Sequence, residues 1–195
     1  MRISCRQVLS ALVTLPLLVA CDDRQTASPD NFARALQSYY DEHPDCVALP
    51  IDLPIGTPVG NADPRRQGAD ALVVAGLLSA TPVNASATVQ YSLTTAGETA
   101  IRKGADPFLG GMTLCYARRK IVKITSFTTP ADVLGVKASR VTFDYELRDI
   151  APWAKAEPLQ DALPEIKSVL AAPSRADTEG VVLTSAGWVD EHVVR

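Results

Sequence analysis

The pattern of hydrophobic and polar positions divides the chain into short helices and strands. Apolar residues three to four positions apart predict a helix over 31–42, with Asp30 as its N-cap and Pro44 just beyond its end. A second helical pattern covers 68–78. These elements are short because the sequence contains 14 prolines, which interrupt helices and strands.

Strict alternation of apolar and polar residues is clearest over 137–150, where every second residue from Val141 to Leu147 is apolar. This pattern predicts a strand with one buried face and one face in water. A second strand is predicted over 114–127, and the loop 128–136 joins the two into a long antiparallel β-hairpin. Pairing about this loop is expected to bring Arg119 near Glu146, so that opposite charges face each other.

Two five-residue segments share a pattern, Leu-Thr-Thr-Ala-Gly at 93–97 and Leu-Thr-Ser-Ala-Gly at 183–187. Each follows a predicted short strand, so we expect a hydroxyl-capped turn that opens a helix at both. In the first segment, Thr95 and Glu98 have the spacing of a capping box. Further predictions are a proline-rich loop over 50–64, short strands over 47–49, 89–93 and 180–183, and short helices at Pro152, Pro158 and Pro164.

Together these elements predict an α+β fold of short helices with a long antiparallel β-hairpin. The order helix, Ala-Gly-Leu-Leu at 75–78, strand, Leu-Thr-Thr-Ala-Gly, helix resembles part of a winged-helix domain. That resemblance implies a DNA-binding unit, but in an exported, acidic protein we expect a packing or protein-binding unit. We expect a single domain over 30–195, with two small lobes of about 30–110 and 111–195 as the alternative.

The first 21 residues have the features of a secretory signal. Arg2 and Arg6 precede an apolar run over 8–20, which at 13 residues is shorter than the roughly 20 that a membrane-spanning helix needs. The ending Leu18-Val19-Ala20-Cys21 resembles the lipobox of bacterial lipoprotein precursors. The resemblance implies that the signal peptide 1–20 is removed and that Cys21 carries a diacylglycerol and a further acyl chain such as palmitate. The alternatives are an ordinary cleaved signal with a free cysteine, or a buried N-terminal helix.

Residues 21–29 are then the lipidated cysteine and a polar tether that ends in Pro29. Asp22, directly after the cysteine, resembles the signal that retains enteric lipoproteins in the inner membrane. We therefore favour the periplasmic face of the inner membrane, with the outer membrane as the alternative.

Cysteine usage agrees with an oxidising compartment. Cys5 is lost with the signal peptide and Cys21 is lipidated, which leaves Cys46 and Cys115 as an even pair. We expect these two to form a disulfide, the alternative being two buried free thiols.

The formal net charge of −3 argues against a nucleic-acid partner. A candidate partner-binding surface is suggested by basic residues of the hairpin and by the two tryptophans. The alternative assigns the basic residues to a solvated strand face and the tryptophans to the core. The residues concerned are Arg118, Arg119, Lys123, Trp153 and Trp188.

Residues suited to catalysis are scarce. His43 lies near Cys46, which would make a nucleophile pair only if the thiol were free, and His192 lies close to the C-terminus. No motif for a metal, nucleotide or other cofactor is present, so none is expected. The sequence favours a non-enzymatic protein-binding or accessory module; the alternative is a periplasmic hydrolase-type enzyme whose site is not visible in the sequence.

Overall fold

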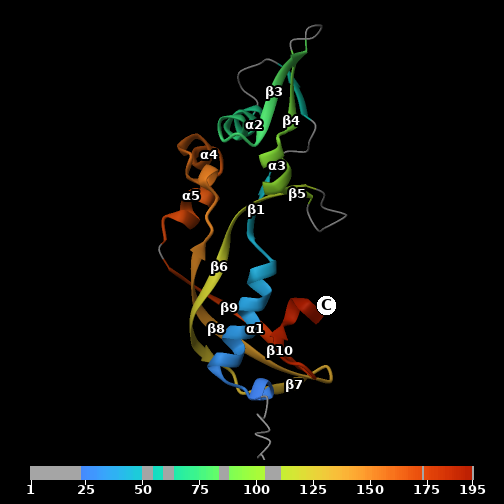
Figure 1. The fold of residues 1–195 in the computed structure, drawn as a ribbon, viewed down its shortest axis with the longest axis vertical. Coiled ribbons are helices and arrows are strands. Elements are labelled where there is room, and N and C mark those ends of the chain that lie inside the picture. The colour runs from blue at the N-terminus through green and yellow to red at the C-terminus, as the bar shows by residue number, and fades with distance from the viewer. Residues whose placement is uncertain are drawn as a thin grey trace, which may run out of the picture.

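The computed structural model describes residues 23–49, 55–58, 64–83, 88–103, 111–172 and 174–194, and within them the fold is α+β. The elements are arranged along one long axis (Figure 1). No helix among these residues is long and apolar enough to cross a membrane. The predicted signal peptide over 1–20, the predicted lipidation site Cys21, and Asp22 lie outside the described residues.

A curled antiparallel sheet runs through the lower and middle parts of the molecule (Figure 1). Its longest strands are β6 (Met112–Phe127) and β8 (Val136–Arg148), which pair with each other. The strand order is β1-β6-β8-β9-β10, with β5 on β6 and β7 on β8. The other strands are β1 (Asp45–Leu49), β5 (Ile101–Lys103), β7 (Ala131–Val133), β9 (Arg175–Thr184) and β10 (Gly187–Asp190).

The segment that connects β6 with β8 differs from the simple loop predicted over 128–136. It contains β7, which turns back onto β8 through Leu134 and Gly135, both with positive φ angles of 51° and 85°. The predicted pairing of Arg119 with Glu146 is off by one residue. Arg119 lies opposite Leu147, and Lys120 lies opposite Glu146. Strand β7 occupies the first residues of β8, so β6 begins its pairing with Phe127 opposite Val141, and two irregularities then shift the register. Counting outward from a simple loop over 128–136 therefore gives the wrong partner.

Helix α1 (Pro29–Glu42) packs across the concave face of the lower sheet (Figure 1). Its N-cap is Ser28 rather than Asp30, because the Ser28 hydroxyl accepts from the Asn31 amide at 3.3 Å and Pro29 occupies the first turn. The apolar side of the helix fills a lower core with residues of β8, β9 and β10. This core includes Phe32, Leu36, Tyr40, Val141, Phe143, Val181 and Trp188.

The upper end of the molecule carries a separate sheet in the order β2-β4-β3. Strand β2 (Ile55–Pro58) lies in the segment predicted as a loop. Helix α2 (Pro64–Val74) ends earlier than predicted because Gly76, at φ 74°, takes a left-handed conformation after it. The remaining elements there are β3 (Leu78–Val83), β4 (Thr88–Leu93) and α3 (Thr95–Ala100), whose N-cap is Thr94 rather than Thr95.

Short helices with proline in the first turn, as predicted, lie between β8 and β9 in the chain. They are η2 (Pro152–Lys155), α4 (Glu157–Ala162) and α5 (Pro164–Leu170). Their apolar residues join an upper core that includes Leu72, Leu77, Tyr91, Leu114, Leu159 and Ile166. The two cores do not follow a division at residue 110, because α1 packs on β8–β10 while β6 contributes to both.

The prediction of a last helix that begins at 184–188 is wrong. These residues form the turn between β9 and β10, in which Ala186 N donates to Thr184 Oγ1 at 3.2 Å. Gly187 has φ 116°, and a Cβ there would lie 2.9 Å from Arg24 Cβ, so both backbone and space require glycine. A 3₁₀ helix, η3 (Glu191–Val194), follows.

Candidate functional site

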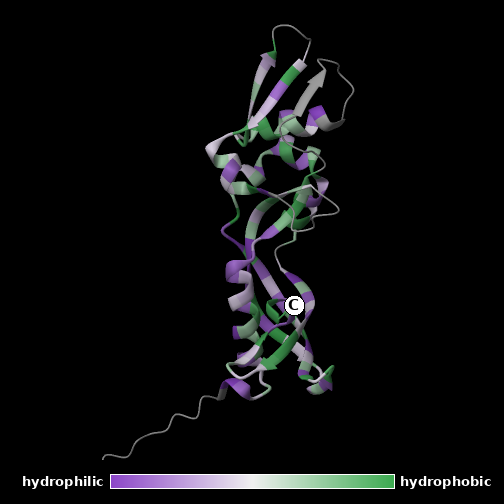
Figure 2. Cartoon of the chain, turned by 90° about the vertical axis from the view of Figure 1, so that its right-hand side faces the viewer, coloured by the Kyte–Doolittle hydropathy of each residue, from purple (hydrophilic) through white to green (hydrophobic). Residues whose placement is uncertain are grey.

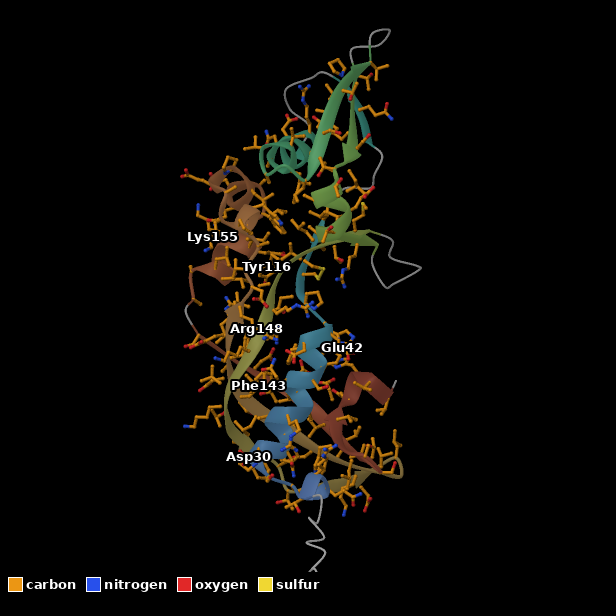
Figure 3. The ribbon with its side chains drawn as sticks, viewed as in Figure 1. Asp30, Glu42, Tyr116, Phe143, Arg148 and Lys155 are labelled. Carbon is orange, nitrogen blue, oxygen red and sulfur yellow. A yellow bond between two sulfur atoms is a disulfide. The ribbon has the colours of Figure 1, made fainter. Side chains whose placement is uncertain are left out.

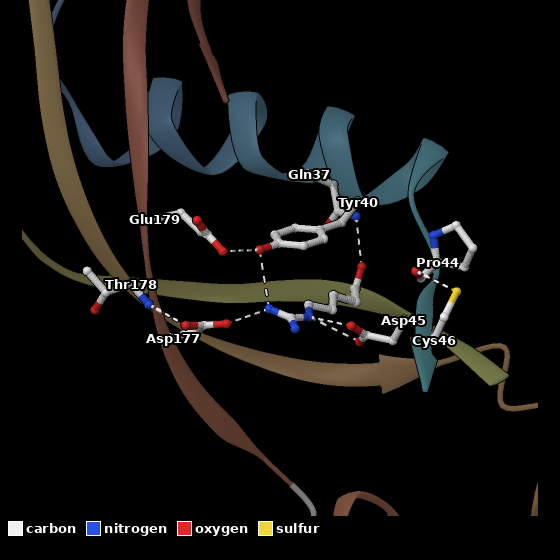
Figure 4. Close-up of polar contacts among 9 residues, drawn as sticks. Gln37, Tyr40, Pro44, Asp45, Cys46, Asp177, Thr178 and Glu179 are labelled. Atoms are coloured by element: carbon white, nitrogen blue, oxygen red, sulfur yellow. Dashed lines mark hydrogen bonds and ion pairs between the residues drawn. The ribbon is translucent and has the colours of Figure 1, made fainter. Parts of the chain in front are cut away.

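Arg119 of β6 is the centre of a polar network between α1 and the sheet. Its partners Tyr40, Asp45 and Asp177 are labelled in Figure 4. Its Nε donates to both carboxylate oxygens of Asp45 at 3.0 Å, and one terminal nitrogen donates to Asp177 Oδ2 at 2.6 Å. The same nitrogen donates to the Tyr40 hydroxyl at 3.2 Å. The guanidinium also lies over the rings of Tyr40 and Tyr145, 4.8 and 4.4 Å from their centroids.

Helix α1 is fixed to this network by two polar side chains on one face. Gln37 accepts from Ile121 N at 2.9 Å and donates to Arg119 O at 3.1 Å, so it pairs with one backbone donor and one backbone acceptor of β6. Tyr40 donates to Glu179 Oε1 of β9 at 3.2 Å. The network therefore joins α1, β1, β6 and β9.

The electrostatic environment fixes the charge state of the two central groups. Burial alone would lower the pKa of Arg119, but the hydrogen bond and the charge of Asp45 outweigh it, so the pKa is raised. Burial raises the pKa of Tyr40, and the opposing charge of Arg119 does not offset it. The network thus consists of a permanent cation, a neutral phenol and surrounding carboxylates.

A groove of about 550 Å³ opens beside this network. Tyr116 and Tyr145 are buried in it, Arg175 lies at its side, and Glu165 and Ser168 of α5 are exposed along it. Arg175 donates to Ser168 O at 3.3 Å, while its Nε is buried and has no hydrogen-bond partner among the described residues. Burial, followed by the charge of Asp45, raises the pKa of Tyr116 to about 12.

The predicted disulfide forms the link between β1 and β6 beside this groove. Cys46 is bonded to Cys115, and the two residues stand opposite each other in the pairing of the strands. The His43–Cys46 nucleophile pair is therefore excluded in the oxidised protein, since Cys46 has no thiolate. His43 instead stacks on Tyr39, with ring centroids 4.0 Å apart.

A second polar cluster lies on the other side of α1, next to a cavity of about 270 Å³ between α1 and β10. The rings of His43, Tyr39 and His192 form a stack along this side. Asp190, which is fully buried, accepts from the His192 backbone at 2.9 Å, and its Oδ1 lies 2.8 Å from His192 Nδ1. Ligand atoms of Glu179, Asp190 and His192 all lie within 4.8 Å of one another.

Sequence reasoning did not find this cluster. Glu179 and Asp190 are separated by a hairpin turn, and only the short spacing of Asp190 and His192 is visible in the sequence. The pairing of β9 and β10, with Asp190 opposite Val181, brings the three together.

The five residues of the predicted partner-binding surface do not form one surface. Arg119 is the centre of the network, and Trp188 is only 6% exposed and packs on Phe32. Trp153 packs against the upper core, and Arg118 donates to the Asp41 carbonyl. Lys123 is exposed, opposite Asp144 in the strand pairing.

Comparison with known proteins gives no match: no protein-family model, curated protein or solved structure is similar to this chain.

Proposed function

We propose that this is a lipid-anchored protein of the bacterial cell envelope, facing the periplasm, which binds a partner protein without catalysing a reaction. The proposed anchor is Cys21 and the proposed binding site is the groove beside Arg119. The inner membrane is favoured by Asp22, and the outer membrane is the alternative.

The observation that carries this proposal is the position of η1, the first described element of the fold. Helix η1 (Asp23–Gln25) lies at the lower end of the long axis (Figure 1). It is held on the β9–β10 hairpin, since Gln25 donates to Ser185 O at 3.2 Å and the Trp188 indole donates to Gln25 O at 3.1 Å. The expected tether over 21–29 is therefore shorter, because residues from Asp23 onward belong to the fold. A lipid on Cys21 would hold this end of the molecule against the bilayer.

The same end exposes an apolar turn between β7 and β8 (Figures 1 and 2). Leu134 at its tip is 101% exposed, and Val133 and Val136 on either side are also exposed. Apolar side chains beside an acyl anchor can enter the bilayer interface and add to the membrane affinity. The disulfide supports the same location in the cell envelope, because such bonds persist outside the cytoplasm.

The groove has the composition of a protein-binding site. Tyrosine and arginine are enriched among the residues that contribute most to protein–protein affinity, and here Tyr116, Tyr145 and Arg175 line one depression. Arg175, beside the groove, carries a guanidinium with several N–H donors that can bind a carbonyl or carboxylate of the partner.

The likeness of the upper end to a winged-helix domain also belongs to this proposal. The order α2, β3, β4, α3 supports it. We assign this unit, together with the β6–β8 hairpin, to packing and protein binding rather than to DNA.

Photo-crosslinking in intact cells tests the binding site. A crosslinking amino acid at Ser168, in the groove, should capture a partner that the same group at Ser126, exposed on the lower part of β6, does not capture. Equal capture at both positions would contradict a groove-specific partner.

The anchor is tested separately with Cys21→Ala. This variant should lose acylation and leave the membrane fraction, as measured by mass spectrometry of the mature N-terminus and by fractionation. An unmodified Cys21 in the wild-type protein would contradict the proposal.

A periplasmic hydrolase-type enzyme remains the second candidate. The observation that favours it is the cluster of Glu179, Asp190 and His192 beside a cavity. Hydrolysis of an envelope substrate by the purified protein, lost in His192→Ala, would replace the binding module with an enzyme.

A further inference from the structure

We propose that Glu179, Asp190 and His192 bind a single zinc ion at the end of the β9–β10 hairpin. The three residues come from β9, from the last position of β10 and from η3. One nitrogen and two carboxylate groups are thereby placed within 4.8 Å of one another. A metal ion with bonds of about 2 Å can bridge ligand atoms at such separations after small side-chain movements.

The carboxylate of Asp190 supplies the second, independent observation. Its side chain is 0% exposed, and its Oδ2 has no hydrogen-bond partner in the part of the chain that the structure describes. A buried carboxylate oxygen without a partner is costly, and a bound cation removes that cost.

A purely structural role accounts for only one of the two carboxylate oxygens of Asp190. Asp190 Oδ1 accepts from the His192 amide and contacts its ring, as the capping residue of η3 would. Such a cap leaves Oδ2 unexplained, and it does not account for a second carboxylate, Glu179, in the same place.

Neighbouring groups hold the ligands in position. The Tyr40 hydroxyl donates to Glu179 Oε1 at 3.2 Å, and the Tyr39 ring lies against the His192 ring at 5.6 Å between centroids. Hydrogen bonds and packing around first ligands usually fix their orientation in metal sites. Asp190 also lines the cavity of about 270 Å³, which leaves room for water as a fourth ligand.

The ligand set indicates which cation fits. Calcium and magnesium are bound by oxygen ligands, whereas imidazole favours zinc and the later first-row metals. Two carboxylates with one imidazole match a zinc site with three protein ligands.

Calorimetric titration of zinc chloride into the mature, tag-free protein, after treatment with a chelator, tests this site. One zinc ion should bind per chain. Glu179→Gln and His192→Ala should each weaken binding by about 100-fold or more, since ligand loss exceeds the usual effect of a supporting residue. His43→Ala is the matched control, because His43 also stacks on Tyr39 but is outside the ligand set; it should bind as the wild type does.

A second measurement separates binding from folding. Zinc should raise the Tm of the wild type and of His43→Ala but not of Glu179→Gln, which keeps the Asp190 cap of η3 intact. No zinc binding by the wild-type protein, or wild-type affinity in Glu179→Gln and His192→Ala, would overturn the proposal and leave Asp190 as a helix cap.

Discussion

Arg119 connects four elements through one side chain that is 18% exposed. Its removal would leave Asp45 and Asp177 as partly buried carboxylates without their cation, and such a change costs about 3 kcal/mol. We therefore expect Arg119→Ala to lower the free energy of unfolding by about this amount, measured by urea denaturation.

Two further variants define the cause of that loss. Lys123→Ala, on the same strand but exposed, should change the free energy of unfolding by less than about 0.5 kcal/mol. Arg119→Lys should recover little, because an ammonium group cannot donate to Asp45 and Asp177 with the same fork. Full recovery by lysine would show that charge alone matters.

Tyr116 gives the protein a pH dependence on the alkaline side. Its pKa is raised by burial to about 12, above the ordinary value near 10. The unfolded chain therefore loses this proton first, and the stabilising contribution present below pH 10 is lost as the pH rises toward 12.

The measurement is urea denaturation of wild type and Tyr116→Phe between pH 9 and 11.5. The loss of stability above pH 10 should be smaller in Tyr116→Phe than in the wild type. Parallel curves would exclude Tyr116 as a source of the alkaline loss.

Residue roles were the hardest feature to predict from the sequence. The run Arg118-Arg119-Lys120 shows three like charges, and nothing in it distinguishes the residue that turns inward. The irregular pairing of β6 decides that, together with Asp177 and Glu179, more than fifty positions away. These are tertiary effects that local patterns do not contain.

Two helical glycines offer a test at the scale of elements. A Cβ on Gly97 in α3 would overlap the Leu77 carbonyl oxygen, which itself accepts from Thr94 N at 3.1 Å. Gly68 in α2 has nothing within 4 Å of the same position. We expect Gly97→Ala to destabilise by about 2–3 kcal/mol, through overpacking.

Gly68→Ala is the matched variant and should have the opposite sign. Alanine in an open helical position stabilises by about 0.5–1 kcal/mol relative to glycine. Thermal unfolding of both variants tests the pair, and a stabilised Gly97→Ala would contradict the close approach of α3 to Leu77.

Elements were predictable where local signals agree with their surroundings. The proline-led helices α4 and α5 begin within one residue of the predicted prolines, and the alternating strand β8 lies within two residues of its predicted bounds. The prediction of a helix at Leu-Thr-Ser-Ala-Gly was wrong because the pattern that it shares with Leu-Thr-Thr-Ala-Gly is compatible with two structures. Thr94 caps a helix through the Gly97 amide, whereas Thr184 closes a hairpin in which Gly187 has a positive φ.

The disulfide acts at the scale of the whole molecule, because it closes a loop of 69 residues between β1 and β6. In the chain-entropy model, a loop of this length contributes about 4 kcal/mol. The double variant Cys46→Ala and Cys115→Ala should lose stability of this order in urea denaturation.

Reduction of the wild-type protein is the parallel experiment. It should reach nearly the stability of the double variant, since both remove the same constraint from the unfolded chain. Unchanged stability in both would mean that the strand pairing alone holds β1 on β6.

At this scale the sequence predicted the α+β class and the cysteine pair but not the arrangement of the cores. Helix α1 closes over strands from the last third of the chain, and β6 extends from one core to the other. The pairing of β9 with β10 creates the cluster of Glu179, Asp190 and His192, of which the sequence shows only the spacing of Asp190 and His192.

The docking of η1 on the β9–β10 hairpin determines the distance between the groove and the proposed lipid anchor at Cys21. Only Asp22 lies between Cys21 and η1, and at about 3.5 Å per residue an acylated Cys21 stays within about 7 Å of the fold. Figure 3 shows Asp30 near the lower end and Tyr116, in the groove, about midway along the molecule. With Cys21 acylated as proposed, the height of the groove above the bilayer is set by rigid strands rather than by a flexible linker. A partner must then present its contact segment at that one distance from the bilayer. Linker residues added after Cys21 would allow contact over a wider range of distances without altering the groove.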